Sequence, residues 1–261
     1  MNTTEYIRHI KKVAKNTRQK QPEFLLMMNS IDVAIQKSIP DFGSKNYAYD
    51  QIYQFMEDDV INPLINFAKA EYKINSDIYA TDFPTGDVNA HAILSPDSDI
   101  IILLDEGMNY AIYYYNIIQL FQGLYRPDDI ERGQFLWTNY VALLKNYITS
   151  QPYVPVKPYE LLSKGNASSY LSELGARTIA QETYVLSHEL GHILAGHLAN
   201  CRIRNVDISN VTLKALEKSQ AQEYEADQVG LNLYINFIEK KVMGGNSELS
   251  DLWVWGNLSI E

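Results

Sequence analysis

The chain has 261 residues, 46% hydrophobic and 21% charged, which is the composition of a globular protein without low-complexity tracts. Its formal net charge of −10 argues against nucleic acid or an anionic membrane as the main partner. No run approaches the roughly 20 apolar residues that span a bilayer, there is no signal-peptide pattern, and one cysteine, Cys201, allows no intrachain disulfide. These features predict a cytoplasmic protein.

The first third of the sequence predicts helices. Residues 1–21 carry six basic residues and one acid, as on the solvated face of an amphipathic helix. Its inward positions are Tyr6, Ile7, Ile10, Val13 and Ala14. Helical spacing of apolar residues continues over 24–38, residues 39–46 predict a loop, and a further helix is expected from about 48 to 72, kinked or split at Pro63.

Three short β-prone runs follow, at 77–81, 88–94 and 99–105, separated by turn-forming residues. They predict a small antiparallel sheet. Helical patterns resume from 108 to 125 and from Pro127 to about 148, and the proline-rich segment 149–158 is expected to be a loop within one compact unit.

Two long helices are expected in the last third. The first starts between 168 and 178, where Thr178 and Gln181 have capping-box spacing, and ends near Asn200. The second runs from about 210 to 242 and ends at a pair of glycines. The predicted fold class is therefore helix-rich α+β, with a single domain over 1–261: a helical part over 1–75, then a small sheet and the functional helices over 76–261.

His188, Glu189 and His192 form an H-E-x-x-H string within "VLSHELGHILAGHL" (185–198). Histidines four positions apart lie on one helix face, about 40° apart around the axis, so both imidazoles can share one divalent ion. Glu189 projects beside the pair, where it can act as general base toward a water activated by zinc. Gly191 disfavours the helix, which indicates that another backbone approaches there.

A catalytic zinc site needs a third protein ligand, and "QEYEADQVG" (222–230) offers one. Glu223 and Asp227 share a helix face, so that with Glu223 on the metal, Asp227 can accept the free N–H of a ligating imidazole. Ala226 and Gly230 are small and near the same face, consistent with a close approach of the two helices. Glu225 points to another side and is the weaker candidate for the third ligand.

His197 is expected to lie outside the metal site. A straight helix places it opposite His188, and the three-histidine arrangement H-x-x-G-x-x-H requires a glycine one position earlier than Gly196. The helix is expected to continue through this region, with His197 either packing in the interior or hydrogen-bonding behind a ligand.

"SHELGHILAGH" followed by "EYEAD" resembles the zinc metallopeptidases of the HtpX and CAAX-prenyl-endopeptidase type, which are gluzincins. The resemblance implies one zinc ion held by His188, His192 and Glu223, with Glu189 as the general base and Asp227 beside the ligands. More weakly, "VNAHAI" is similar to the family's edge strand, where an extended substrate peptide adds. By that resemblance the edge is Asn89 to Ile93, and the substrate-binding residues are Asn89, Ala90 and His91.

The family usually supplies an Arg or His beyond the third ligand to stabilise the oxyanion. This chain has no Arg after Arg204 and no His after His197, which leaves Tyr224, Tyr234 and His91 as candidates.

The predicted function is a zinc-dependent endopeptidase, a hydrolase acting on a protein or peptide substrate through a metal-activated water. One alternative is a regulatory or phage-defence peptidase of the Lit type with one specific protein target. Another is a catalytically silent sensor or interaction protein stabilised by its metal. The simplest structural alternative is a buried helix with incidental histidines.

Overall fold

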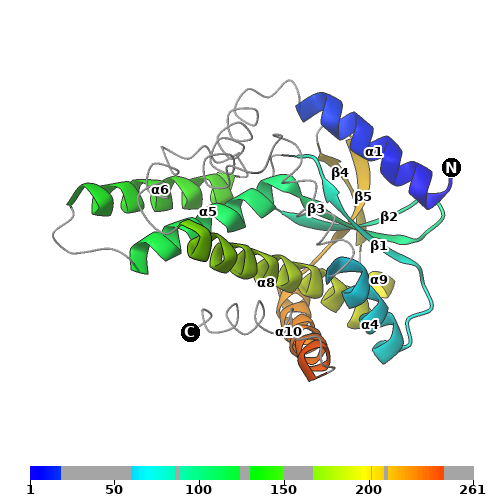
Figure 1. Cartoon of the computed structure of the whole chain (residues 1–261). Helices are drawn as coiled ribbons and strands as arrows, with labels where there is room; N and C mark the ends of the chain where they lie inside the picture. The colour runs from blue at the N-terminus through cyan, green and yellow to red at the C-terminus, as the bar shows by residue number, and fades with distance from the viewer. Residues whose placement is uncertain are drawn as a thin grey trace.

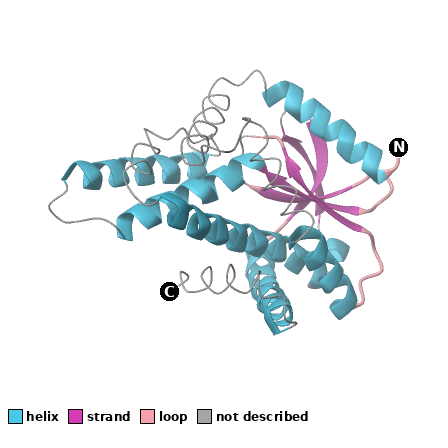
Figure 2. Ribbon diagram, viewed as in Figure 1, coloured by secondary structure: helices cyan, strands magenta, loops and turns pink. Residues whose placement is uncertain are grey.

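The computed structural model describes residues 1–18, 60–85, 89–123, 130–149, 167–200, 202–208 and 211–243. It is a helix-rich α+β structure with one mixed sheet (Figures 1 and 2). The helices are α1 (Thr3–Arg18), α4 (Asn62–Tyr72), α5 (Glu106–Gly123), α6 (Ile130–Thr149), α8 (Ala167–Leu194), α9 (His197–Asn200) and α10 (Gln220–Met243). The strands are β1 (Ile78–Phe83), β2 (Ala90–Leu94), β3 (Ile100–Asp105), β4 (Arg202–Ile208) and β5 (Val211–Glu217).

Several expectations for the N-terminal half are confirmed. The three β-prone runs form β1, β2 and β3, and the amphipathic segment forms α1, with Ile10 and Ala14 buried. Pro63 lies in the first turn of α4, where its missing N–H costs no hydrogen bond. The expected helix over 24–38, the loop over 39–46, the proline-rich residues 150–158 and the chain after 243 lie outside the described residues.

The sheet is mixed, which corrects the prediction of an antiparallel sheet. Its strand order is β1-β3-β2-β5-β4, and β1 pairs with β3 in parallel, whereas β2 pairs with β3 and β4 with β5 in antiparallel fashion. A tight turn joins β2 to β3, in which the Ser98 N–H donates to the Ser95 carbonyl at 3.0 Å. The chain reverses direction once between β1 and β2 and again between β2 and β3, so β1 and β3 run in the same direction. Because β3 lies between β1 and β2 in the sheet, β1 and β3 pair in parallel.

The last third also differs from prediction, because Val211–Glu217, expected to begin a helix, forms strand β5, which pairs antiparallel with β4 (Arg202–Ile208). The expected helix over 210–242 begins only at Gln220. Ser219 caps it: the Gln222 N–H donates to Ser219 Oγ at 3.3 Å, and the Ser219 N–H donates to Gln222 Oε1 at 2.9 Å. This is a capping box, and the capping box expected at Thr178 is instead inside α8.

Thr178 and Gln181 serve a different purpose. Asn116 of α5 is buried, and its Nδ2 donates to Thr178 Oγ1 at 3.2 Å and to Gln181 Oε1 at 2.9 Å. Both acceptors are side chains on α8, so these polar residues join α5 to α8 rather than beginning a helix.

The apolar core lies on both faces of β3, which is buried along its whole length. Ile100, Ile102 and Leu104 point to the side covered by α4, α8 and α10, while Ile101 and Leu103 point to the side covered by α1 (Figure 1). The two-residue alternation of a strand thus anchors α8 and α10 to one face of the sheet. None of the described helices combines the length and apolar character that a membrane-spanning helix requires.

Candidate metal centre

Helices α8 and α10 touch backbone to backbone, and small residues allow it. A Cβ on Gly230 would lie 2.7 Å from the Ser187 carbonyl oxygen and 2.8 Å from the His188 Cα. Gly191 faces the backbone of Ala226 just as tightly, and Ala226 is fully buried. The close approach expected from these small residues is confirmed, and it brings Glu223 on α10 over the two histidines of α8.

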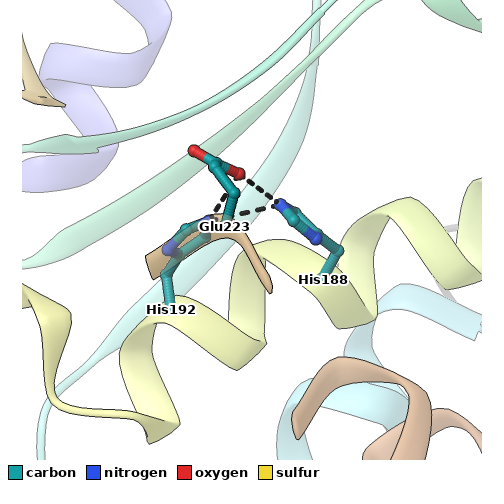
Figure 3. Close-up of side chains that lie close together, drawn as sticks. All are labelled: His188, His192 and Glu223. Carbon is teal, nitrogen blue, oxygen red and sulfur yellow. Dashed lines mark hydrogen bonds and ion pairs between the residues drawn. The ribbon is translucent and has the colours of Figure 1, made fainter. Parts of the chain in front are cut away.

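His188, His192 and Glu223 point toward one another (Figure 3). His188 Nε2 lies 3.1 Å and His192 Nε2 3.3 Å from Glu223 Oε2, and the two Nε2 atoms are 3.2 Å apart. Ligands bonded to zinc at about 2.0–2.1 Å in tetrahedral geometry stand roughly 3.3–3.4 Å from each other. The triangle therefore has the size that a single small cation requires, and this group could hold a metal ion.

The donor chemistry at His188 also fits a cation. His188 Nδ1 lies 2.8 Å from Asp227 Oδ1, and a carboxylate only accepts hydrogen bonds. In the uncharged ring the proton is therefore on Nδ1, and Nε2 presents an electron pair to the Glu223 oxygen. Two acceptors that face each other at 3.1 Å repel unless a positive charge lies between them.

Asp227 is itself held in place. The Tyr184 hydroxyl lies 3.4 Å from Asp227 Oδ1, and burial, then the Asp227 charge, raise the pKa of Tyr184. The hydroxyl consequently stays protonated and donates to the carboxylate. The structure thus brings Asp227 to the side of the His188 ring that faces away from Glu223, the position expected from its spacing after Glu223.

His197 lies behind the second histidine, because α8 does not continue as expected. It ends at Leu194, and Gly196 has a φ of +72°, in the left-handed region that glycine tolerates best. The chain then turns back into α9, and His197 Nδ1 lies 2.9 Å from His192 Nδ1. Of the two roles expected for His197, the structure shows a hydrogen bond behind a candidate ligand, and the ring is also buried.

Glu189 follows His188 on α8 and lies in the interior, with its side chain 5% exposed. Lys218 Nζ donates to both of its carboxylate oxygens, at 3.0 and 2.9 Å. Burial, followed by the charges of Lys218, His188 and His197, lowers the pKa of His192 to about 3. His192 is therefore uncharged at neutral pH, which is the form of imidazole that coordinates metals.

Comparisons with known protein families, with curated proteins and with solved structures found no match.

The other candidate residues make contacts of their own. Glu225, the weaker candidate for the third ligand, instead places Oε2 3.1 Å from His197 Nε2. Among the residues considered for the oxyanion, Tyr224 is exposed on α10, whereas Tyr234 is buried edge-to-face against Tyr184. His91 Nε2 lies 3.2 Å from the Oδ2 atom of Asp105, which is fully buried.

The expected substrate edge is corrected by the strand order. The strand at Asn89 to Ile93 corresponds to β2, which lies between β3 and β5 rather than at an edge of the sheet. Its one recorded pair with β5 joins Ile93 to Ala215, and its Asn89 and Ala90 end lies beyond that pair. The edge positions belong to β1 and β4 instead.

Lys218 is the residue of this centre that sequence reasoning missed. It lies between β5 and α10, and the expectation of one continuous helix over 210–242 hid that junction. Two signals were available: the alternating pattern "VTLKALE" over 211–217, which is typical of a strand, and Ser219 with Gln222 at capping-box spacing.

Proposed function

We propose that the chain is a metal-dependent peptidase and that its ion is zinc. The observation that carries the proposal is the convergence of two imidazole nitrogens and one carboxylate oxygen, 3.1–3.3 Å apart, around a point that needs a positive charge. Two histidines and one glutamate are a ligand set of catalytic zinc, which leaves a fourth position for water or substrate. The H-E-x-x-H string and the E-x-x-x-D spacing of the resembled gluzincins support the same conclusion.

The bound ion would supply Lewis acidity, polarising a peptide carbonyl and lowering the pKa of a water molecule. Glu189 then acts as general base: its carboxylate accepts the proton of the attacking water and passes it to the departing amine. Its place directly after His188 and its burial support this role, because a carboxylate shielded from bulk water keeps a fixed orientation.

Lys218 supplies the positive charge that stabilises Glu189 in this buried position. An isolated carboxylate in the protein interior is strongly unfavourable, and a partner that donates to both of its oxygens offsets that cost. To act on water, Glu189 has to share one oxygen between Lys218 and the proton that it accepts. The lysine thus holds the general base in one orientation before the substrate arrives.

The test combines metal analysis with peptide hydrolysis on the purified full chain. Wild type is expected to contain about one zinc per chain by mass spectrometry of the metal, and to cleave members of a mixed peptide library. Glu189→Gln should keep the zinc and lose at least about a hundredfold in rate, in keeping with loss of a general base. Glu223→Ala should lose most of the zinc. A chain that takes up no stoichiometric zinc, even after incubation with it, contradicts the proposal.

A narrow substrate range calls for a second measurement. Cells that express wild type are compared with cells that express Glu189→Gln, and new protein termini are identified by mass spectrometry. One new terminus in one protein identifies a peptidase with a specific target. Zinc binding with no new terminus and no peptide cleavage contradicts the enzymatic role and favours the silent metal-stabilised protein.

A further inference from the structure

A second chain of contacts starts at the metal-facing His192 and leads to the protein surface. His192 Nδ1 lies 2.9 Å from His197 Nδ1, and His197 Nε2 lies 3.1 Å from Glu225 Oε2. His192 and His197 are buried, whereas the Glu225 side chain is 61% exposed. Two ring nitrogens in contact do not by themselves show which of them carries the proton, so the direction of this hydrogen bond has to come from its neighbours.

Glu225 supplies the direction. A carboxylate accepts hydrogen bonds, so His197 donates to it from a protonated Nε2. An uncharged imidazole carries one proton, which leaves Nδ1 of His197 as an acceptor. The contact between the two rings then requires His192 to donate from Nδ1, and the electron pair of His192 is on Nε2, the atom that faces His188 and Glu223.

We infer that His197 and Glu225 are positioning residues, which hold His192 in the tautomer that leaves Nε2 free to bind a divalent cation. This inference rests on the proposed metal centre and adds a second support to it. Asp227 does the same for His188 directly, at 2.8 Å. Three acidic residues at alternate positions of α10 therefore have different roles. Glu223 faces the ion, whereas Glu225 and Asp227 determine which nitrogen of each ligand ring carries the proton.

The sharp end of α8 makes the relay possible. On a continuous helix, residues five positions apart point about 140° away from each other, so His192 and His197 would not meet. The left-handed Gly196 ends α8 and returns His197 to the back of the His192 ring. The same turn directs the other ring nitrogen of His197, Nε2, at Glu225 on α10.

The tautomers can be read without any substrate. The full chain is labelled with ¹⁵N-histidine, stripped of metal by a chelator, and measured by long-range ¹H–¹⁵N correlation, which distinguishes a protonated from a bare ring nitrogen. In wild type, His188 and His192 are expected to be protonated on Nδ1, with bare Nε2 atoms whose signals shift when Zn²⁺ is added. A His192 ring protonated on Nε2 in the metal-free chain overturns the inference.

Variants separate positioning from mere packing. His197→Phe removes the acceptor and keeps an aromatic ring, so His192 should become a mixture of tautomers, and Zn²⁺ affinity should fall about 10- to 100-fold. His197→Asn places an amide oxygen near the lost Nδ1 and should restore most of the tautomer and the affinity. A His197→Phe chain that keeps both overturns the inference.

Glu225→Ala removes the acceptor without disturbing the interior, because this side chain is mostly exposed. It should weaken Zn²⁺ binding several-fold and broaden the His192 tautomer signal, whereas Glu239→Ala, at an exposed acid on the same helix, should change neither. Equal effects of the two changes overturn the relay. Because these readouts involve no peptide, a chain with the expected tautomers and zinc dependence but no cleavage disproves only the peptidase role.

Discussion

Lys218 Nζ donates to both carboxylate oxygens of Glu189, at 3.0 and 2.9 Å, in a place where neither side chain has much access to water. The pair joins the segment just before α10 to the C-terminal part of α8. It therefore connects the end of β5, a strand that the sequence did not predict, to the H-E-x-x-H string that it did. Because both charges are buried, each depends on the other far more than a surface pair would.

Lys218→Met should lower the free energy of unfolding by about 3 kcal/mol, because it leaves the Glu189 carboxylate buried without a partner. Denaturant titration of wild type, both single variants and the double variant Glu189→Gln/Lys218→Met measures the coupling between the two positions. We expect the double variant to recover at least about 1 kcal/mol relative to the sum of the single changes. Strictly additive effects would show that the ion pair does not contribute.

Gly230→Ala should weaken the structure although alanine favours helices. Its Cβ would stand 2.8 Å from the His188 Cα, so α8 and α10 must separate, at a cost of about 1–3 kcal/mol. The separation moves Glu223 away from the histidines, and Zn²⁺ affinity should fall at least about tenfold, as expected when a ligand is displaced. Isothermal titration calorimetry measures the affinity, and thermal unfolding the stability.

Asn232→Ala is the matched control, since Asn232 is an exposed position of the same helix two residues further on. It should leave zinc affinity unchanged and stability the same or slightly higher, because it raises helix propensity. Were Gly230→Ala to stabilise the chain as well, the close contact of the two helices would not limit either property.

Zinc should stabilise the chain through its three candidate ligands. An ion that binds only the folded state, at a hundredfold excess over its Kd, adds about 2.7 kcal/mol, which is roughly 5–10 °C in Tm for a chain of this size. Differential scanning fluorimetry with Zn²⁺, then with a chelator, should show the rise and its reversal. Glu223→Ala should remove most of the shift, and His9→Gln, at an exposed histidine on α1, should keep it all.

Two pairs of residues four positions apart in the sequence predicted the juxtapositions of the candidate centre, because such contacts are local. His188 with His192, and Glu223 with Asp227, need only a regular helix to share a face. Gly191 and Gly230 added that two helices meet closely, since glycine inside a helix is unfavourable unless something requires the space.

Features that depend on chain reversals were missed. The break after α8 depends on a single residue in the left-handed region, Gly196. Apolar residues stand both before and after it, so the spacing of apolar residues does not reveal the break. The antiparallel pair β4–β5 was not predicted. Residues 211–217 fall within the helix expected over 210–242, because the alternation of β5 is short and amphipathic, and no strand is expected over 202–208. As a result the contact of Lys218 was not predicted, although Ser219 marked the true start of α10, and the hydrogen bond of His197 was only one of two roles expected for it.

Glu182 on α8 should make stability depend on pH, independently of the metal. Burial raises the pKa of its carboxyl from 4.5 to about 8, so the folded chain keeps this proton over a range in which the unfolded chain releases it. Stability is therefore lost as the pH rises from about 4.5 through 8. Glu182→Gln, which mimics the protonated form, should be close to wild type at pH 5. At pH 8 it should be more stable by at least about 1 kcal/mol, the equivalent of roughly one unit of pKa shift.

Urea titrations of the Glu182→Gln variant and wild type at both pH values, with a chelator present, measure this difference in stability. The exposed Glu239→Gln is the control for the change in charge. A gain in stability that is the same at pH 5 and pH 8 would show that the Glu182 carboxyl is already ionised in the folded chain.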